Sequence, residues 1–458
     1  MDLSRNEIKG TLLADSGFQL AYEPALNLSW NQLEGPIPSF LSKASTLDLS
    51  NNKLSKVDSF LCSTNVSNLN FLDLSSNQLS EELPNCWKHF EHLVFLDLSS
   101  NKFSGNIPTT MSSLSSIETL KLDNNRFAGE LPSSLKNCTN LRVFDLESNE
   151  LSGPIPKWLG VGVSNLAILI LRSNHFNGSM PSQLCHLTSI QVLDLSMNNI
   201  SGSIPKCLNN LTTLAEKGSS HLTIWHSYTS QRESTETHTS SSDAFYDDEV
   251  SIMWKGIFAK YKSTLGLLKS IDFSSNRLTG EIPSAITDLV GLVSLNLSRN
   301  NLTGQITPNI GKLQSLDSLD ISRNQIHCAI PTSLARIDRL AYLDLSYNNL
   351  SGEIPTSTQL QGFDPSVYAG NSQLCGLPLK KICDPKGTGQ PNVSSNQEDH
   401  DELKTQDFYI SLGLGFSVGF WGVCGSLIFK KSWRYAYYNF LNASNDWLYV
   451  KVALIRRN

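Results

Sequence analysis

The sequence predicts an α/β repeat fold, a solenoid in which each repeat adds one short strand to a parallel sheet. Asparagine recurs at a nearly constant spacing, interrupted by one shorter interval after Asn31 and one much longer interval after Asn198. The recurring positions are Asn6, Asn31, Asn52, Asn77, Asn101, Asn125, Asn149, Asn174, Asn198, Asn276, Asn300, Asn324 and Asn348. Each lies in all or part of the apolar frame LxxLxLxxNxL, which defines a leucine-rich repeat. We therefore expect a right-handed horseshoe or superhelix with its parallel sheet on the concave face.

The composition excludes several classes of protein. Of the 458 residues, 40% are hydrophobic and 17% are charged, and the formal net charge is −6. This balance is too apolar for a disordered chain and too polar for a protein that spans a membrane many times. A mildly acidic chain also lacks the basic surface that is typical of nucleic-acid binding, so we expect no nucleic-acid partner.

The leucines of each repeat predict a short strand that is followed by a turn. In the segment Leu69-x-x-Leu72-x-Leu74, the last two leucines alternate and therefore face one side of a strand. The asparagine at the turn can hydrogen-bond to backbone groups of neighbouring repeats, as buried backbone requires. We interpret the recurring asparagines as a structural ladder rather than as a ligand site.

The second half of most repeats reads G-x-I-P, as from Gly105 to Pro108. Glycine permits a tight backbone, and proline fixes φ where the chain bends onto the convex side. This motif resembles that of the plant-type extracellular leucine-rich repeat. Glu81 and Cys328 replace the glycine, and we interpret these departures as local irregularities of one fold.

The N-terminus falls in the middle of a repeat, because Leu3 and Asn6 already occupy frame positions. Neither a signal peptide nor an N-terminal cap for the solenoid precedes them. We therefore expect an N-terminally truncated chain, with a naturally short form as the alternative.

The interval between Asn198 and Asn276 is much longer than a single repeat, so it holds one repeat and additional chain. It predicts an insertion, here called the island, at residues 213–265. The first part, Ser219 to Asp248, is rich in Ser, Thr, His and Asp and is predicted to be a loop. The second part, Val250 to Leu268, regains apolar and aromatic residues. A long insertion in a compact fold is commonly functional.

The order of the segments resembles that of the plant receptor-like proteins. These are kinase-less leucine-rich-repeat proteins that include the receptors for the fungal ethylene-inducing xylanase and the Cf-type immune receptors. The island carries two patterns of that family, Tyr-x8-Lys-Gly at Tyr246 and Lys255-Gly256, and Lys-x5-Tyr at Lys255 and Tyr261. The predicted segments are about nine repeats at 1–212, the island at 213–265, four repeats at 266–355, a C-terminal cap at 356–384, an acidic juxtamembrane stretch at 385–407, a transmembrane helix at 408–429 and a cytoplasmic tail at 430–458.

The resemblance implies a protein or peptide ligand, such as a microbial elicitor, that is bound by the concave face and the island. Candidate ligand-binding residues on the strands are those that depart from the usual Asp and Ser. They are Lys121, Asp123, Glu147, Ile168, Ile170, Arg172 and His175, and the island adds Tyr246, Lys255, Gly256 and Tyr261. The alternative for Trp254, Phe258 and Tyr261 is that they only anchor the island on neighbouring repeats.

The resemblance also implies adaptor and co-receptor kinases as partners. In the family, the repeats after the island contact the co-receptor kinase, and the corresponding positions here are Asn296, Ser298, Asp320, Ser322, Tyr342 and Asp344. Ser411, Gly415 and Gly419 lie on one face of the predicted transmembrane helix. Small residues at this spacing let two helices approach closely in lipid, and in the family such a face pairs with the adaptor kinase.

Residues 408–429, FYISLGLGFSVGFWGVCGSLIF, carry no charge and are long enough to cross a bilayer as one helix. Lys430, Lys431 and Arg434 follow them, which places the C-terminus in the cytoplasm. We expect a single-pass type I protein of the plasma membrane with an extracellular N-terminus. The tail at 430–458 is too short to hold a kinase domain.

Cysteine spacing predicts disulfides between neighbouring repeats, because the partners lie one repeat apart and adjacent turns are within disulfide distance. The predicted pairs are Cys62 with Cys86 and Cys185 with Cys207. The segment NSQLCGLPLKKIC resembles the C-terminal cap of the family, which implies that Cys375 pairs with Cys383. Cys138 is predicted to be a buried free thiol, and Cys328 has no assigned role.

Sequons for N-glycosylation on one side of the predicted span fit an ectodomain that passes through the secretory pathway. They lie at Asn27, Asn65, Asn137, Asn177, Asn199, Asn210, Asn296, Asn301, Asn349 and Asn392.

No arrangement of residues indicates an enzyme, a metal site or a cofactor. His89 and His92 lack further metal ligands, and the repeated Asp-x-Ser strings are strand positions rather than parts of a catalytic triad. The resemblance implies a cell-surface receptor of plant defence that signals through partner kinases. The alternatives are a developmental peptide co-receptor of the same architecture and a non-signalling decoy or inhibitor-type binding protein.

Overall fold

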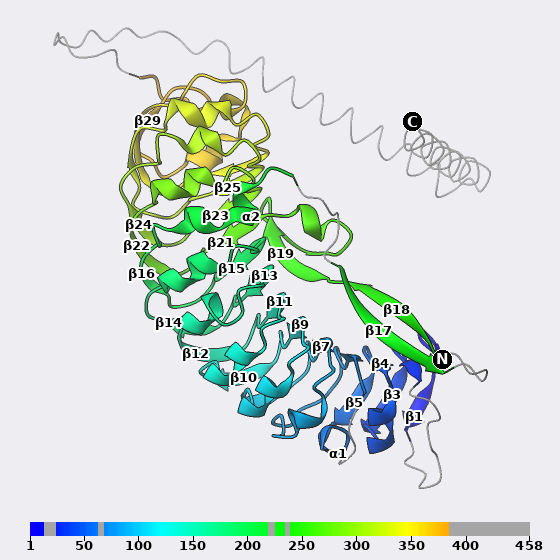
Figure 1. Ribbon diagram of the computed structural model, residues 1–458. Helices are drawn as coiled ribbons and strands as arrows, with labels where there is room; N and C mark the ends of the chain where they lie inside the picture. Colours follow the sequence, from blue (N-terminus) through cyan, green and yellow to red (C-terminus); the bar gives the residue numbers. More distant parts are fainter. Residues whose placement is uncertain (13–23, 63–67, 219–224, 234–238, 384–458) are drawn as a thin grey trace, which may run out of the picture. The chain divides into compact units, whose positions relative to one another are not determined.

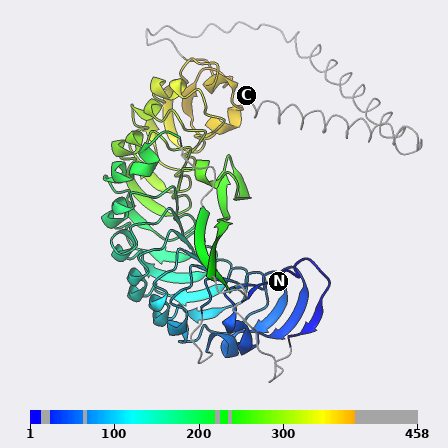
Figure 2. The same ribbon diagram turned by 45° about the vertical axis from the view of Figure 1, so that its right-hand side comes forward.

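The computed structural model describes residues 1–12, 24–62, 68–218, 225–233 and 239–383. Within the unit Met1–Asp384, the chain winds into a curved solenoid of stacked turns (Figures 1 and 2). A typical turn contains a strand on the concave side, the ladder asparagine, a second strand and a short helix. The predicted leucine-rich repeat solenoid is therefore confirmed.

The concave face of the described chain is a twelve-stranded parallel sheet. Its strands, in spatial order, are β2 (Ala25–Asn27), β4 (Thr46–Asp48), β6 (Phe71–Asp73), β7 (Phe95–Asp97), β9 (Thr119–Lys121), β11 (Val143–Asp145), β13 (Ile168–Ile170), β15 (Val192–Asp194), β21 (Ser270–Asp272), β23 (Ser294–Asn296), β25 (Ser318–Asp320) and β27 (Tyr342–Asp344). The central residue of each strand, for example Leu96 of β7 or Phe144 of β11, is buried in the core. The first and third residues of each strand face the opposite, concave side.

The second strands form smaller parallel sheets. These consist of β1 (Lys9–Thr11), β3 (Gln32–Pro36) and β5 (Lys53–Lys56); β8 (Ser104–Asn106), β10 (Arg126–Gly129), β12 (Glu150–Pro154) and β14 (His175–Asn177); β16 (Ser201–Ser203), β22 (Arg277–Glu281) and β24 (Asn301–Thr303); and β26 (His327–Cys328), β28 (Asn349–Glu353) and β29 (Gln373–Cys375). The repeat glycine lies here with a positive φ, for example 82° at Gly153, which a residue with a side chain rarely adopts.

Short helices complete the repeats, and many begin directly after the proline of the G-x-I-P motif, whose φ of about −65° suits a helix start. The α-helices of the described chain are α1 (Asp58–Leu61) and α2 (Thr212–Ala215). The 3-10 helices are Ser39–Lys43, Trp87–His89, Thr109–Ser113, Ser133–Asn137, Lys157–Gly160, Ser182–His186, Leu208–Asn210, Leu265–Leu267, Ser284–Asp288, Ile310–Lys312, Thr332–Arg336, Leu360–Gly362 and Pro365–Tyr368.

The asparagine ladder continues across the island. The Asn276 amide donates to Leu195 O at 3.0 Å, and its Oδ1 accepts from Ile200 N at 3.0 Å. Strand β21 pairs directly with β15, so the repeats on either side of the island stack as neighbours. Asn371, which is outside the predicted ladder, makes the same contacts with Leu345 O and Leu350 N. The structural interpretation of the ladder is confirmed, and the ladder extends one turn into the cap.

The island contains two antiparallel hairpins. Strand β17 (Trp225–Glu233) pairs with β18 (Thr239–Asp247), so the prediction of a loop from Ser219 to Asp248 is wrong for these residues. Strand β19 (Val250–Trp254) pairs with β20 (Ile257–Tyr261). The two residues that connect β19 and β20, Lys255 and Gly256, have φ values of 53° and 71°, as a type I′ hairpin turn requires. Both hairpins lie on the concave side of the solenoid (Figures 1 and 2).

The described chain has three disulfides, and they join the three predicted pairs. The Cα atoms are 5.0 Å apart for Cys62 and Cys86, 5.8 Å for Cys185 and Cys207, and 5.1 Å for Cys375 and Cys383. Cys138 is a buried free thiol, as predicted, and burial raises its pKa to about 11. Cys328 is exposed and adopts the positive φ of the glycine that it replaces, 70°.

The predicted juxtamembrane stretch, span and tail lie outside the described residues, together with Ser411, Gly415 and Gly419. In the ranges that the structure does describe, no helix has the length and apolar character needed to cross a bilayer.

Candidate ligand-binding face

Two columns of side chains run along the concave sheet, because its parallel strands pair in register. The leading column contains the first residue of each strand and includes Phe71, Phe95, Thr119, Val143, Ile168, Val192, Ser270, Ser294, Ser318 and Tyr342. The carboxylate column contains the third residue and includes Asp48, Asp73, Asp97, Lys121, Asp145, Ile170, Asp194, Asp272, Asn296, Asp320 and Asp344. The island lies across part of both columns.

Tyr246 of the island packs against the two phenylalanines of the leading column. Phe71 and Phe95 stack with their ring centroids 4.3 Å apart, and the Tyr246 ring meets them edge-on at 5.8 and 4.8 Å. The Tyr246 hydroxyl donates to Thr119 Oγ1 at 3.2 Å. Burial, aided by the Asp248 charge, raises the pKa of Tyr246 above its ordinary value. This predicted ligand residue is therefore a contact between the island and the concave face.

A buried polar network continues from Tyr246. Thr119 Oγ1 lies 3.2 Å from both carboxylate oxygens of Asp248, which is fully buried. Lys121 Nζ lies 3.8 Å from Asp248 and donates to Glu249 O at 2.8 Å. Burial alone would lower the pKa of Lys121, but Asp248 and neighbouring carboxylates outweigh burial and raise it. Lys121 is therefore charged and held by the island.

Ile168 and Ile170 lie beneath the island. Both are fully buried in an apolar cluster that also includes Val250 and Ile252 of β19 and Leu268. These two predicted ligand contacts offer no exposed surface, because the island covers them. Trp254 and Tyr261 pack against the same cluster. The contacts agree with the alternative in which island aromatics anchor the island.

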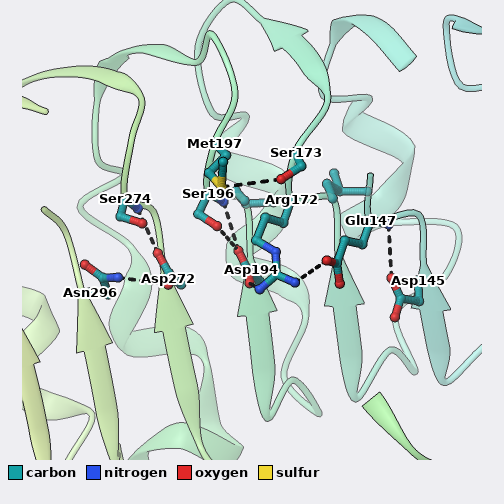
Figure 3. A network of polar contacts seen from close by, with 12 residues as sticks. Asp145, Glu147, Arg172, Ser173, Asp194, Ser196, Met197, Asp272, Ser274 and Asn296 are labelled. Atoms are coloured by element: carbon teal, nitrogen blue, oxygen red, sulfur yellow. Dashed lines mark hydrogen bonds and ion pairs between the residues drawn. The ribbon is translucent and has the colours of Figure 1, made fainter. Parts of the chain in front are cut away.

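Arg172 connects two acidic residues of neighbouring repeats (Figure 3). Its guanidinium pairs with Glu147 and lies 3.5 Å from Asp194 Oδ2. The guanidinium also lies 3.9 Å from the centroid of the Phe258 ring of the island. Arg172 and Glu147, both predicted ligand residues, are buried and are paired with each other. Asp123 is half-buried, and burial together with the Asp97 charge raises its pKa to about 7.

The tip of the second hairpin contacts the repeats that follow the island. Lys255 Nζ lies 2.8 Å from Asp317 Oδ2 and 4.7 Å from the centroid of the Trp254 ring. Gly256 lies against Tyr342, because a Cβ atom added to it would be 3.0 Å from Tyr342 Cε2. The Lys-Gly pair therefore brings a predicted ligand-binding turn onto the predicted co-receptor-binding repeats.

His175 is not on the concave face. It is exposed in β14, in the sheet of second strands, because the chain has already turned at Asn174. The prediction that His175 belongs to the concave strand positions is wrong for this reason.

The predicted co-receptor residues all lie on the concave face, on or just after β23, β25 and β27. Asn296 takes the place of an aspartate in the carboxylate column, and its amide donates to Asp272 Oδ2 at 3.0 Å. Its Oδ1 accepts from Ser298 Oγ at 2.7 Å. Ser298 and Ser322 are buried, whereas Asp320, Tyr342 and Asp344 are half-buried.

The sequons differ in accessibility. Asn27 and Asn296 are half-buried on the concave sheet, where their side chains form hydrogen bonds. The exposed sequon asparagines are Asn137, Asn177, Asn199, Asn210, Asn301 and Asn349. Asn65 and Asn392 lie outside the described residues.

Two grooves flank the island on the concave face. The N-terminal groove has a volume of about 620 Å³ and includes Asp48, Asp73, Asp97, Tyr246 and Lys260 in its lining. The post-island groove has a volume of about 260 Å³. Its lining includes Met253, Lys255, Gly256, Asp272, Ser294, Asn296, Ser298, Ser318, Asp320 and Tyr342. Met253, Asp272, Ser294 and Ser318 were not among the predicted site residues, although the repeat frame gives the strand positions of Asp272, Ser294 and Ser318. Among the described residues, no group of histidine, cysteine and acidic side chains could hold a metal ion.

Family models described as leucine rich repeat match residues 42–103 and, repeat by repeat, residues 25–44, 116–138, 140–161, 189–211, 267–289, 291–313 and 339–360. The chain is 48% identical over 459 residues to receptor-like protein EIX2 of Solanum lycopersicum, which covers 98% of this chain and 44% of that protein. It is 60% identical over 210 residues to receptor-like protein EIX1 of the same species, which covers 44% of this chain and 20% of the relative. The chain thus spans less than half the length of these relatives.

Solved plant ectodomains share the fold. The HAESA receptor kinase ectodomain of Arabidopsis, in complex with an extended IDA peptide hormone, matches with a TM-score of 0.65 and 30% identity over 84% of this chain and 55% of that one. The ectodomain of GASSHO1/SCHENGEN3 from Arabidopsis thaliana, in complex with CASPARIAN STRIP INTEGRITY FACTOR 2, matches with a TM-score of 0.61 and 28% identity over 84% of this chain and 42% of that one.

The repeats, the shared fold and the identity to EIX2 along nearly the whole chain lead to one conclusion. The chain belongs to the plant leucine-rich-repeat receptor-like proteins.

Proposed function

We propose that this chain recognises a microbial protein or peptide at the plant cell surface and signals through partner receptor kinases in defence. The observation that carries the proposal is the position of the island across the concave face, with an open groove on each side. A protein or peptide ligand that enters either groove would contact both the island and the repeats. Such a ligand would therefore bias how the island lies against the solenoid.

The partners follow from the segments of the chain. Residues 408–429 are proposed to anchor the chain in the plasma membrane as a single type I span, with Ser411, Gly415 and Gly419 as the face that pairs with an adaptor kinase. The post-island repeats are proposed to contact a co-receptor kinase ectodomain. The exposed sequons are proposed to carry glycans. The partner kinases are proposed to supply the catalytic activity of signalling.

A second candidate function is the perception of an endogenous peptide in development. The similarity to the HAESA ectodomain, which is solved with a peptide hormone, favours it. Both functions use the same concave face, and they differ in the source of the ligand.

Expression of the full chain in leaf tissue, followed by challenge with a panel of microbial elicitors, tests the defence function. We expect at least one elicitor to increase co-precipitation of a partner kinase with the chain. His175→Ala serves as a matched control, because His175 is exposed outside the concave face and should leave the response unchanged. No response to the panel, together with a growth phenotype on deletion, would favour the developmental function instead.

A further inference from the structure

We propose that the post-island groove binds the side chain of a lysine or an arginine of the ligand, an assignment that rests on the proposed function. The floor of the groove consists of hydroxyls and carboxylates, and one wall is the tip of the island hairpin. The hydroxyls, the carboxylates and the walls each support a cationic side chain.

The hydroxyls of the groove belong to successive strands of the leading column. Ser294, Ser318 and Tyr342 lie side by side on β23, β25 and β27. Ser294 and Ser318 are each only 5% exposed, yet neither hydroxyl has a hydrogen-bond partner within the part of the chain that the structure describes. Both hydroxyls line the groove and keep their hydrogen-bonding capacity, so a ligand that enters the groove can hydrogen-bond to them.

The carboxylates supply acceptors beside these hydroxyls. Asp272 accepts from Ser274 N and from the Asn296 amide, and Asp320 accepts from Ser322 N. Neither carboxylate has an ion-pair partner among the described residues. An ionised carboxylate only accepts hydrogen bonds, and lysine and arginine side chains only donate them. A cationic ligand group favours the ionised form of these carboxylates, whereas an anionic group disfavours it.

The cations already in the lining do not neutralise this floor. Arg172 is paired with Glu147 and Asp194, and Lys255 is paired with Asp317. Arg299, the remaining cation of the lining, is exposed where its repeat turns away from the concave face. Arg172 and Lys255 are thus paired elsewhere and Arg299 is exposed, whereas Asp272 and Asp320 have no cationic partner among the described residues.

The walls suit the stem of a long basic side chain. Met253 of the island and the half-buried ring of Tyr342 provide apolar surface on the lining of the groove. Lysine and arginine bury their aliphatic stems against such surface, and a cation over an aromatic ring gains further attraction. Gly256 leaves room for the Tyr342 ring, because any side chain on this turn residue would contact it.

The test uses the full chain in a neutral detergent and three capped tripeptides, Ala-Arg-Ala, Ala-Lys-Ala and Ala-norleucine-Ala. Saturation-transfer NMR measures their binding. We expect at least one basic tripeptide to bind about tenfold or more tightly than the norleucine control, since norleucine has the aliphatic stem but cannot donate a charged hydrogen bond. We expect Asp320→Asn to weaken that binding about tenfold, whereas Asp338→Asn leaves it unchanged. Asp338→Asn makes the same change of side chain, but Asp338 is exposed and lines neither groove.

Equal binding of all three tripeptides, or an unchanged affinity in Asp320→Asn, would overturn the proposal. If Asp320→Asn lowers the melting temperature, the double variant Ser294→Ala and Ser318→Ala replaces it and should weaken binding of the basic tripeptide as well. If the chain responds to an elicitor but shows no preference for the basic tripeptides, only the assignment of the groove is overturned. A selective tripeptide signal without any elicitor response overturns only the proposed function.

Discussion

The ammonium of Lys255 lies 2.8 Å from a carboxylate oxygen of Asp317. Lys255 is the first residue of the hairpin turn between β19 and β20, and Asp317 directly precedes β25. This pair joins the tip of the island to repeats that follow it in the sequence. The other end of the island is held by Tyr246 and Asp248 against repeats that precede it. The island thus spans the concave face between two groups of contacts.

Lys255→Ala should release the hairpin tip without unfolding the solenoid. Because the Lys255 side chain is 38% exposed, the ion pair contributes about 1 kcal/mol or less. We expect faster amide hydrogen exchange in β19 and β20, measured by mass spectrometry. Lys312→Ala is the matched control, because it removes an exposed pair with Asp288 at 3.3 Å away from the island. Equal exchange in β19 and β20 for wild type and Lys255→Ala would contradict this role.

Asp248→Ala should destabilise the chain much more strongly. Asp248 is fully buried, and its removal leaves the buried ammonium of Lys121 without its carboxylate partner. Loss of one member of a buried pair costs about 3–5 kcal/mol of unfolding free energy. Guanidinium unfolding curves measure this cost as a lowered midpoint.

Glu249→Gln provides the control for Asp248→Ala. Glu249 is the next residue, but its ion pair with Lys260 is exposed and its side chain should contribute little. A midpoint for Asp248→Ala that equals that of Glu249→Gln would show that the buried network does not hold the island.

Stability should fall as pH rises from about 4 to about 7. Burial and the Asp194 charge raise the pKa of Asp272 to about 7, and burial and the Asp97 charge do the same for Asp123. Because the pKa of each aspartate is higher in the folded state, folding favours the protonated form. The resulting stabilisation is complete below the unfolded-state pKa of about 3.9, and it is lost as pH rises to the folded-state pKa of about 7. Melting temperatures from pH 4 to 8 measure the slope.

Asp272→Asn should flatten this pH dependence, because the amide cannot ionise. Asp338→Asn, an exposed position outside the concave sheet, should leave the slope as in the wild type. An identical slope in wild type and Asp272→Asn would assign the pH dependence to other groups.

Gly256→Ala should destabilise the hairpin tip for two reasons. Gly256 has a φ of 71°, and an added Cβ would lie 3.0 Å from Tyr342 Cε2. Gly218→Ala separates the effect of the positive φ from that of the steric contact. Gly218 has a φ of 78°, but no atom lies within 4 Å of an added Cβ. We expect a larger drop in melting temperature for Gly256→Ala, and Tyr342→Ala in the same chain should remove the difference. Equal drops for both glycines would show that the contact with Tyr342 is unimportant.

The repeat frame by itself predicted the solenoid, the concave parallel sheet and the role of the asparagine ladder. These features depend on residues within one repeat and its neighbours, so the regular spacing of the frame is sufficient to identify them. Asn371 was missed because it lies in the C-terminal cap. The cap keeps the ladder asparagine, but it contributes no strand to the concave sheet. The hairpin of β17 and β18 was missed because its strands lack an alternating apolar pattern, which is the usual signal of a half-buried strand.

The sequence could name concave positions with unusual side chains, but it could not show which of them the island covers. Ile168, Ile170 and Lys121 are unusual because they hold the island, whereas Ser294 and Ser318 look ordinary and line an open groove. This distinction depends on contacts between residues far apart in the sequence, such as Thr119 and Asp248, which are separated by 129 positions. Local patterns determine how each repeat folds, and only the tertiary structure decides which side chains meet across such a distance.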